Sequence, residues 1–451
     1  MSELARRRQS CGLHSQLKDP PSLSAPHLPE GIKRARKRVV IAALYLGTGH
    51  HERELVSLLQ QACERNRDLR VSILLDCARG LRGDPNSAAM LRPLVEAHPG
   101  SVSVSLYQTP DLRGLVKRFA PPRWNEIVGV SHYKAFVFDD DTMLSGANLS
   151  DQYFTNRQDR YMLFRQSPEL SDFFETLINK SSEFCFGVTP QGGIQLPPGC
   201  PHPETAPIAE FADYARSRIA PLLAPAAPAG TNSAASASAQ TWVFPTVQMG
   251  RFGIHQDERV TELVLSSCTA SGATLDLASA YFNITKRYKA AILSPHNQAQ
   301  VNIITASPEA NGFFNSKGMS QHIPMGYTAM EKQFFEEVQA RGQGERVRIF
   351  EYFREGWTFH GKGLWYTPAG QSRPILTMIG SPNFGRRSTD RDLEAQVVVL
   401  TEDPELRGKL AEEKEMLFAS TTLVRSATFE KADRYVQPWA KLTTGLLSSY
   451  F

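Results

Sequence analysis

Apolar runs and amphipathic segments alternate along the first part of the chain. Val39–Leu46 has the pattern of a strand, and Glu52–Asn66 has the i, i+3, i+4 apolar spacing of a helix. Strands alternating with helices are typical of an α/β fold, in which helices cover the faces of a sheet. The same alternation continues through the strand-like Val71–Asp76, Val102–Tyr107 and Ala135–Phe138 and the helix-like Leu170–Phe184.

The alternation stops between residues 191 and 240, where Pro, Ala, Ser and Gly dominate. Pro221–Gln240 is of low complexity and has too little apolar surface to offset the entropy lost on ordering. We therefore expect a linker or loop over 191–240. The Pro-rich residues 1–30 lack apolar periodicity as well, and we expect them to form a disordered tail.

The alternation then restarts in the same order, which suggests an internal duplication. We expect a first domain over 31–190 and a second over 241–451, each a mixed sheet flanked by helices. The strands expected in the second part are Thr274–Ala278, Val301–Ala306, Val347–Tyr352, Gly363–Tyr366, Ile375–Ile379 and Gln396–Leu400, and its helices are Tyr327–Ala340 and Glu405–Phe418.

Composition narrows the class of protein. The 451 residues are 41% hydrophobic and 21% charged, which is ordinary for a globular protein, and the net charge of +4 is too small for a nucleic-acid coat protein. No apolar run approaches the roughly 20 residues of a membrane span. The six cysteines form no C-x-x-C pair, which argues against a zinc site and favours free thiols in a reducing compartment.

One short pattern occurs twice, 228 residues apart. His132-x-Lys134 and His360-x-Lys362 each precede a short apolar run, a turn and a return that ends in an asparagine, Asn148 or Asn383. Residues i and i+2 of a strand point to the same face, so each His and Lys project together. If the two halves pair, two copies of this trio meet in one shared active site.

Such a site suits a phosphodiester. One imidazole can attack phosphorus while the other, protonated, donates to the leaving oxygen. Lysine ammonium groups and asparagine amides can hold the non-bridging oxygens and offset the charge that develops in the transition state. This chemistry requires no metal and no cofactor.

Each histidine also needs a carboxylate to orient its ring. Asp159 lies 27 residues after His132, and Glu394 lies 34 residues after His360. Both precede strand-like runs, and we expect them to orient the histidines. The alternative for each is a surface salt bridge with a neighbouring arginine.

At these residues the chain resembles the phospholipase D superfamily, whose H-x-K-x4-D motif occurs twice per active site. His132, Lys134 and Asp139 match the first motif, whereas Thr367 replaces the acidic residue of the second. Within that superfamily, four segments look like the eukaryotic mitochondrial phosphatidylglycerophosphate synthase family. They are Val39–Gly49, Leu144–Tyr161, Ser307–Phe314 and Gly380–Gln396.

The resemblance implies two phospholipase D-like domains and an activity. The family transfers a phosphatidyl group from CDP-diacylglycerol to glycerol-3-phosphate through a phosphatidyl-histidine, and releases CMP. His132 would be the nucleophile and His360 the acid and then the base, although the roles could be reversed. Asp139 would belong to the catalytic set. A mitochondrial location on the inner membrane, with peripheral attachment, is also implied, yet residues 1–30 contain no evident import signal.

Further binding residues follow from the same comparison of motifs. The acceptor carries a phosphomonoester, for which arginines beside the motifs are candidates. The Gly-x-Gly stretch after the first strand is a candidate for binding the nucleotide, or a plain strand-ending turn. Aromatic loops at Asn311–Phe314 and Gly356–Phe359 could touch the membrane. The arginines are Arg157, Arg160, Arg386, Arg387 and Arg391, and the nucleotide stretch is Ala42, Ala43, Leu44, Tyr45, Leu46, Gly47, Thr48 and Gly49.

Four other functions use the same residues. Water as acceptor would give a phospholipase D-type hydrolase or a nuclease, and serine would give phosphatidylserine synthase. The arginine-rich flank favours a phosphorylated acceptor over water, and a nuclease would carry a stronger basic charge than +4. A non-catalytic lipid-binding scaffold would not need two histidines.

Overall fold

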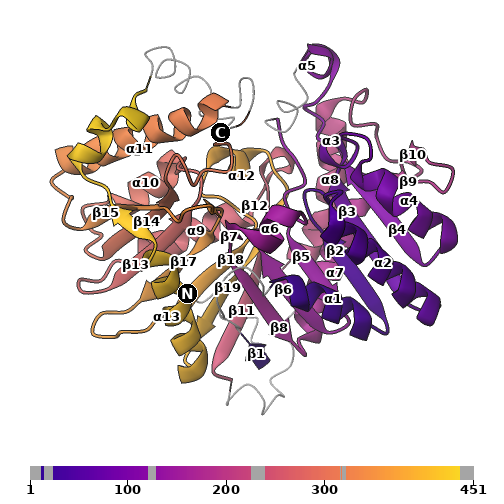
Figure 1. Ribbon diagram of the computed structural model, residues 1–451, viewed down its shortest axis with the longest axis horizontal. Helices are drawn as coiled ribbons and strands as arrows, with labels where there is room; N and C mark the ends of the chain where they lie inside the picture. The colour runs from indigo at the N-terminus through magenta and orange to yellow at the C-terminus, as the bar shows by residue number, and fades with distance from the viewer. Residues whose placement is uncertain are drawn as a thin grey trace.

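The computed structural model describes residues 12–14, 24–119, 128–224, 239–314, 316 and 321–436. Within them the chain forms two α/β halves that lie side by side (Figure 1). The predicted fold class, mixed sheets flanked by helices, is confirmed. The helices of the first half are α1 (Ser24–Arg34), α2 (His50–Arg65), α3 (Cys77–Gly80), α4 (Ser87–Ala97), α5 (Gly114–Phe119), α6 (Asp151–Thr155), α7 (Pro168–Ser182) and α8 (Ile208–Leu223).

Two nine-stranded sheets carry the two halves. The first has the order β1-β8-β6-β5-β2-β3-β4-β9-β10. Its strands are β1 (Gly12–His14), β2 (Arg38–Ala42), β3 (Arg70–Asp76), β4 (Val102–Tyr107), β5 (Ala135–Phe138), β6 (Asp141–Ser145), β8 (Tyr161–Arg165), β9 (Phe186–Val188) and β10 (Ile194–Gln195).

The second sheet has the order β12-β11-β19-β18-β17-β13-β14-β15-β20. Its strands are β11 (Thr241–Met249), β12 (Ile254–His255), β13 (Thr274–Ser279), β14 (Gln300–Ala306), β15 (Val347–Tyr352), β17 (Lys362–Thr367), β18 (Leu376–Gly380), β19 (Glu394–Thr401) and β20 (Thr421–Leu423). The helices of this half are α9 (Gln256–Ser267), α10 (Lys286–Ile292), α11 (Ile323–Ala340), α12 (Arg386–Asp390) and α13 (Pro404–Phe418).

Seven neighbouring strands follow the same order in both sheets. β8-β6-β5-β2-β3-β4-β9 corresponds to β19-β18-β17-β13-β14-β15-β20. In each half three strands are parallel, β2, β3 and β4 or β13, β14 and β15, and the remaining pairs are antiparallel. This repeated topology is the one that an internal duplication would produce.

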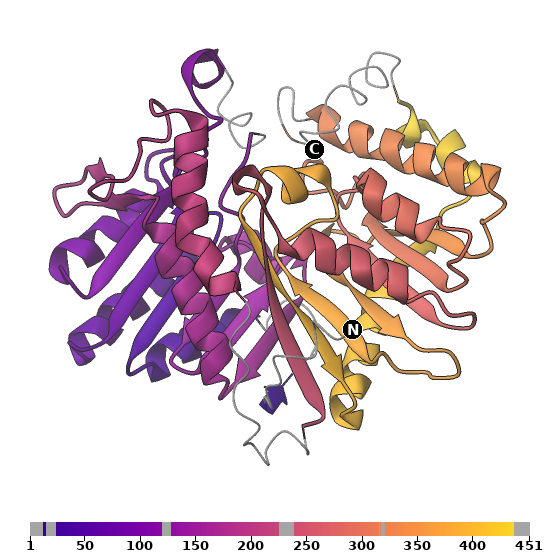
Figure 2. The same cartoon turned by 180° about the vertical axis from the view of Figure 1, so that it is seen from behind.

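Alternate residues of the central strands face two different cores. Val39 and Ile41 of β2 pack with α1, α2 and α4, whereas Val40 and Ala42 of the same strand pack with α7 and α8. Figure 2, the view from behind, shows α7 and α8 against the first sheet. Because both faces of each sheet are covered, the central strands are almost continuously apolar.

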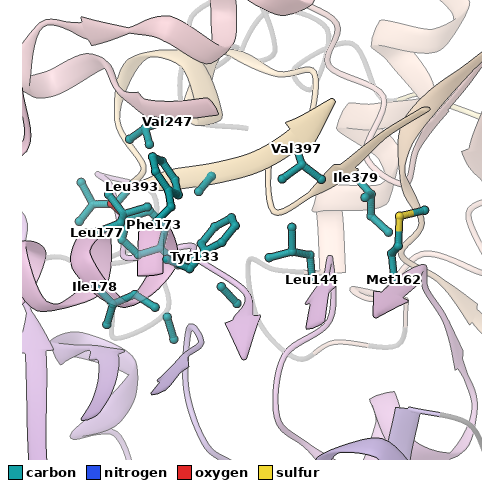
Figure 3. Packing of buried hydrophobic residues seen from close by; sticks show 14 of the residues in the cluster. Tyr133, Leu144, Met162, Phe173, Leu177, Ile178, Val247, Ile379, Leu393 and Val397 are labelled. Carbon is teal, nitrogen blue, oxygen red and sulfur yellow. The ribbon is translucent and has the colours of Figure 1, made fainter. Parts of the chain in front are cut away.

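A single apolar core joins the halves. Leu144 of β6 and Met162 of β8 belong to the same buried cluster as Ile379 of β18 and Val397 of β19 (Figure 3). The strands β6 and β18 also contact each other directly. The two halves therefore share one interior, to which β6 and β18, the strands that precede the predicted asparagines, both contribute.

The segment 191–240 differs from the expected linker. Its residues Ile208–Leu223 form α8, whose Phe211, Ala215 and Ile219 are completely buried in the shared core. These positions have i, i+4, i+8 spacing, a helical signal that the Pro- and Ala-rich composition of the segment obscured. Residues 225–238, the most repetitive part of the predicted loop, lie outside the described residues.

The expected disordered tail is also partly wrong. Gly12–His14 pairs as a strand with β8, and α1 begins at Ser24. Leu28 and Ile32 of that helix are buried one turn apart in the core of the first half. An apolar pair at i, i+4 is a short signal, and neighbouring prolines made it easy to overlook.

Arg160 binds the second half from the start of the first half's β8. Its guanidinium donates to both carboxylate oxygens of Glu413 at 2.9 Å and stacks over the ring of Trp365. The other N–H groups donate to the carbonyls of Lys362 and Met378 and to the Thr377 hydroxyl. All five donors are thus satisfied in a buried setting.

Arg160→Ala should destabilise the protein by about 3–5 kcal/mol, because it leaves the buried carboxylate of Glu413 without its cation. Denaturant unfolding measures this loss. The exposed Arg67 is the matched control, and its alanine variant should change the free energy of unfolding by no more than about 0.5 kcal/mol. An equally small effect at Arg160 would contradict its role at the interface.

Candidate functional site

Each predicted histidine lies on a segment whose backbone pairs with the other half. The amide of His132 donates to the carbonyl of Leu393, and the amide of Leu393 donates to that of Val130, both at 2.9 Å. For His360, the strand that precedes it, β16 (Thr358–Phe359), pairs in parallel with β7 (Arg157–Gln158) of the first half. The amide of His360 then donates to the carbonyl of Gln158 at 2.7 Å. The two connections place both histidines at the junction of the halves.

The paired segments continue into the predicted carboxylates, but the partners are exchanged. Nδ1 of His132 lies 3.0 Å from both carboxylate oxygens of Glu394. Nδ1 of His360 lies 2.7 Å from Oδ2 of Asp159. The prediction identified the correct carboxylates and placed each with the histidine upstream of it in the same half. In the structure each carboxylate instead binds the histidine of the other half.

Burial sets the charge of these groups. Both histidines are almost completely buried, and desolvation, reinforced by the neighbouring lysines, holds their pKa values well below 6.5. Burial also raises the pKa of Asp159 to about 6 and raises that of Glu394. A neutral imidazole beside a carboxylate donates its Nδ1–H and keeps a lone pair on Nε2. Both rings are therefore prepared to act as nucleophile or base.

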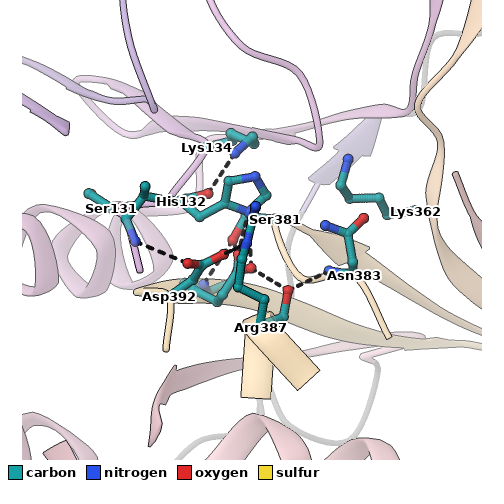
Figure 4. Close-up of polar contacts among 12 residues, drawn as sticks. Ser131, His132, Lys134, Lys362, Ser381, Asn383, Arg387 and Asp392 are labelled. Atoms are coloured by element: carbon teal, nitrogen blue, oxygen red, sulfur yellow. Dashed lines mark hydrogen bonds and ion pairs between the residues drawn. The ribbon is translucent and has the colours of Figure 1, made fainter. Parts of the chain in front are cut away.

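The two lysines are buried beside the histidines, as predicted. Lys134 donates to the carbonyl of His132 at 2.7 Å, and Lys362 donates to that of His360 at 3.0 Å. Figure 4 shows Lys362 and Asn383 of the second half beside His132 of the first. Desolvation lowers the pKa of Lys134 to about 7 and that of Lys362 to about 8.

The predicted asparagines lie among the same buried polar groups. Nδ2 of Asn148 donates to the hydroxyl of Tyr153 at 3.0 Å, and the backbone amide of Asn383 donates to Ser388. The Oδ1 atoms of both side chains are buried and have no hydrogen-bond partner. These oxygens can accept a hydrogen bond from a ligand hydroxyl, whereas the expected contacts to phosphate oxygens would have to come from the Nδ2–H groups and stay a prediction.

Asp139 does not lie with the other motif residues. It follows the end of β5 opposite to His132, and its carboxylate accepts from the backbone amides of residues 36, 37 and 38 at 2.7–3.0 Å. In the structure Asp139 thus anchors the chain before β2, and its expected place in the catalytic set stays a prediction. Thr367 ends β17 in the second half and shows that this anchor can be replaced.

The five predicted arginines separate into three groups. Arg160 has no donor left for a phosphate, so the structure removes it from the acceptor site. Arg386 is exposed and pairs with Asp390, and Arg391 is only partly buried. Arg157 and Arg387 form the third group. Arg387 lowers the pKa of His132, Arg157 lowers that of His360, and both lower that of Lys362.

Arg157 and Arg387 approach Lys362 from opposite halves of the chain. Nε of Arg157 donates to the Thr358 hydroxyl at 2.9 Å, and its guanidinium lies 4.7 Å from the centre of the Tyr153 ring. Gly312 lies close by, since a Cβ there would be 3.1 Å from Nη2 of Arg157. Arg387 donates from Nε to Asp392 at 2.8 Å, which leaves its other nitrogens for a ligand.

The Gly47-Thr48-Gly49 stretch has a structural reason for its glycines. A Cβ on Gly47 would lie 2.2 Å from the carboxylate of Glu52, and one on Gly49 would lie 2.1 Å from that of Asp151. Two acidic groups beside the loop make it a poor cradle for phosphate. The amides of residues 43, 46 and 47 are also bound by the fold. Within the predicted nucleotide stretch, Tyr45 lies close enough to Arg157 and Tyr153 to raise the pKa of both side chains electrostatically.

Sequence reasoning missed three residues of the site. Asp392 accepts from the amide of Val130, Ser388 donates to Glu394 at 2.6 Å, and the hydroxyl of Tyr153 lies 3.4 Å from Nε2 of His360. A signal was present in the spacing, because Tyr153 and Ser388 each lie five residues after a motif asparagine. Since the two residues differ chemically, the repeat did not reveal them.

One buried group resembles a metal site. His132, Asp392 and Glu394 place ligand atoms within 4.8 Å of one another. The carboxylate oxygens, however, already accept from Arg387, Ser388 and the backbone, and Lys134 lies close to them. This arrangement fits a hydrogen-bonded histidine better than a metal ion, and metal-free chemistry stays a prediction.

Comparison with known proteins adds relatives and a fold. No family model matches the chain. It is 43% identical to the mitochondrial CDP-diacylglycerol–glycerol-3-phosphate 3-phosphatidyltransferases of Gallus gallus and Homo sapiens, over 93% of this chain and 80% of each relative. It is 33% identical to the corresponding transferase of Saccharomyces cerevisiae, over 98% of this chain and 90% of that relative.

A solved structure shares the fold. Phosphatidylserine synthase of Haemophilus influenzae superposes with a TM-score of 0.73 and 19% identity, over 95% of this chain and 93% of that chain. At this identity the likeness concerns the fold alone. It extends over 95% of this chain and therefore includes both halves.

The lysine pKa values predict how the site binds a simple dianion. Sulfate should bind when Lys134 and Lys362 are protonated. Its affinity should fall as pH rises through about 7–8, by roughly tenfold per pH unit for each lysine that loses its proton. Isothermal titration calorimetry between pH 6 and 9 measures the slope. Lys134→Met should weaken binding and flatten the slope, the exposed Lys33→Met should do neither, and an affinity independent of pH would contradict the assignment.

Proposed function

Because the chain belongs to the family of CDP-diacylglycerol–glycerol-3-phosphate 3-phosphatidyltransferases, we propose that it transfers a phosphatidyl group from CDP-diacylglycerol to glycerol-3-phosphate. The products are phosphatidylglycerophosphate, the precursor of phosphatidylglycerol and cardiolipin, and CMP. The observation that carries this proposal is the pair of buried histidines, each held by a carboxylate of the other half. Like its named relatives, the protein acts in mitochondria.

The first step forms a covalent intermediate. Nε2 of His132 attacks the phosphorus that bears the diacylglycerol, the bond from that phosphorus to the bridging oxygen breaks, and CMP leaves. A phosphate monoester such as CMP is stable as an anion, with a second pKa of about 6, so its departure needs little protonation. The ammonium groups of Lys134 and Lys362 and the amides of Asn148 and Asn383 hold the non-bridging oxygens.

The second step transfers the phosphatidyl group to the acceptor. The 1-hydroxyl of glycerol-3-phosphate attacks phosphorus, its proton passes to Nε2 of His360, and the bond between phosphorus and His132 breaks. His360 suits this role because its lowered pKa keeps it neutral, and Asp159 stabilises the imidazolium that forms. Arg157 and Arg387 bind the phosphate of the acceptor.

The diacylglycerol substrate requires contact with a membrane surface, and we propose peripheral attachment. Within the described part of the chain, no helix is sufficiently long and apolar to cross a bilayer. Phe314 of the predicted Asn311–Phe314 loop is 47% exposed and can insert into the interface. In the Gly356–Phe359 loop Phe359 is buried, so Trp357 is the better candidate there.

A product assay tests the reaction and the roles of the histidines. Purified protein in mixed micelles receives CDP-diacylglycerol with glycerol-3-phosphate, glycerol, serine or water, and lipids are identified by mass. Phosphatidylglycerophosphate should form only with glycerol-3-phosphate. His132→Ala and His360→Ala should each lower its rate by about 10²–10⁴-fold or more.

Substrate labelled at the phosphatidyl phosphorus then separates the two histidines. The His360→Ala variant should retain label on the protein, since its second step is slowed, whereas His132→Ala should retain none. Label on the His132→Ala protein would reverse the assignment. Phosphatidic acid in every tube would instead identify a hydrolase.

The acceptor site gives a separate prediction. Arg157→Ala and Arg387→Ala should each raise the KM for glycerol-3-phosphate by roughly 10–100-fold, because each removes a charge-assisted hydrogen bond to its phosphate. Arg386→Ala is the matched control, since that side chain is exposed and pairs with Asp390. A rise in the KM for CDP-diacylglycerol instead would move these arginines to the nucleotide site.

A further inference from the structure

The two halves of the site differ at one pair of equivalent positions. Tyr153 is the third residue of α6 and Ser388 the third residue of α12, and each lies five residues after its motif asparagine and six before its motif carboxylate. Ser388 donates to Glu394 and accepts from the backbone amide of Asn383, so its contacts are to the carboxylate and the motif asparagine. The hydroxyl of Tyr153 instead reaches Nε2 of His360, at 3.4 Å.

Tyr153 is held firmly against this histidine. It is 2% exposed, and its hydroxyl accepts a hydrogen bond from Nδ2 of Asn148. Its ring meets the imidazole of His360 edge-on, with centroids 5.2 Å apart, and the Arg157 guanidinium lies over the ring. A hydroxyl that accepts from Asn148 can donate to the lone pair on Nε2, which Nζ of Lys362 also approaches, at 3.1 Å. The phenol and the ammonium group together therefore cover Nε2.

A second aromatic ring also packs against His360. Tyr281 also meets the imidazole edge-on, at 5.7 Å between centroids, and stacks on Tyr327 at 5.2 Å. No ring contact to His132 is recorded among the described residues. Both imidazoles are buried to the same degree, but only that of His360 is packed against tyrosine rings within the described part of the chain.

We propose that Tyr153 determines the acceptor by keeping water away from Nε2 of His360 until an acceptor hydroxyl displaces the phenol. This inference rests on the proposed function and concerns its second step. There the acceptor O–H gives its proton to Nε2, the oxygen bonds to phosphorus, and the bond between phosphorus and His132 breaks. If water takes the same place, the identical proton and bond changes yield phosphatidic acid. Tyr153 therefore favours transfer over hydrolysis.

The test is the ratio of phosphatidic acid to phosphatidylglycerophosphate formed from CDP-diacylglycerol with saturating glycerol-3-phosphate. Tyr153→Ser introduces the residue of the other half and opens space for water, and it should raise the ratio by roughly fivefold or more, the factor that one hydrogen bond implies. Tyr153→Phe retains the ring and should raise the ratio less. If the serine variant does not fold, the same ratio is measured for Tyr153→Leu, and an increase is again expected.

Ser388→Ala is the matched control at the equivalent position. It should slow both products, through Glu394, and leave their ratio unchanged. A purely structural role of Tyr153 would likewise lower both rates without changing the ratio, and that result would overturn the inference. If the wild-type protein forms no phosphatidylglycerophosphate, the proposed function fails instead, so the two failures are distinguishable.

Discussion

The hydrogen bond from each histidine to a carboxylate of the other half is the interaction on which the site depends. A buried imidazole needs a fixed partner at Nδ1 to hold one tautomer and one orientation. Here that partner arrives on a segment whose backbone is already paired with the histidine segment, through Leu393 on one side and Gln158 on the other. The shared apolar core and the buried Arg160 hold these segments in register. The geometry of the histidines therefore depends on how the two halves pack.

The burial of so many charged groups has an electrostatic consequence. Lys134, Lys362, Arg157 and Arg387 converge on a place where Asp159, Glu394 and Asp392 are the opposing charges. Desolvation lowers the pKa of the lysines and raises that of the carboxyls, which shifts these groups toward their neutral forms. An incoming phosphodiester favours the charged form of the lysines, so substrate binding and lysine protonation assist each other.

Local patterns predicted the residues of the site better than their partners. His132 and Lys134 follow from the two-residue period of a strand, and the repeat of His, Lys and Asn predicted a shared site. The exchange of Asp159 and Glu394 depends on contacts between residues more than 200 positions apart, which no local pattern contains. The segment with α8 shows another limit, since its composition concealed Phe211, Ala215 and Ile219. Asp139 matched a motif by spacing alone, and only the direction of β5 revealed that it points away from His132.

The exchanged carboxylates also bear on how such a chain can change over generations. In a protein of two self-sufficient copies, either copy can decay while the other maintains activity. Here neither half contains a complete histidine and carboxylate pair, so loss of one half would leave the other without an oriented base. The two halves nevertheless differ around this bond, as Asp159 and Glu394 or Tyr153 and Ser388 illustrate. The arrangement thus makes each half depend on the other while leaving each one open to specialise.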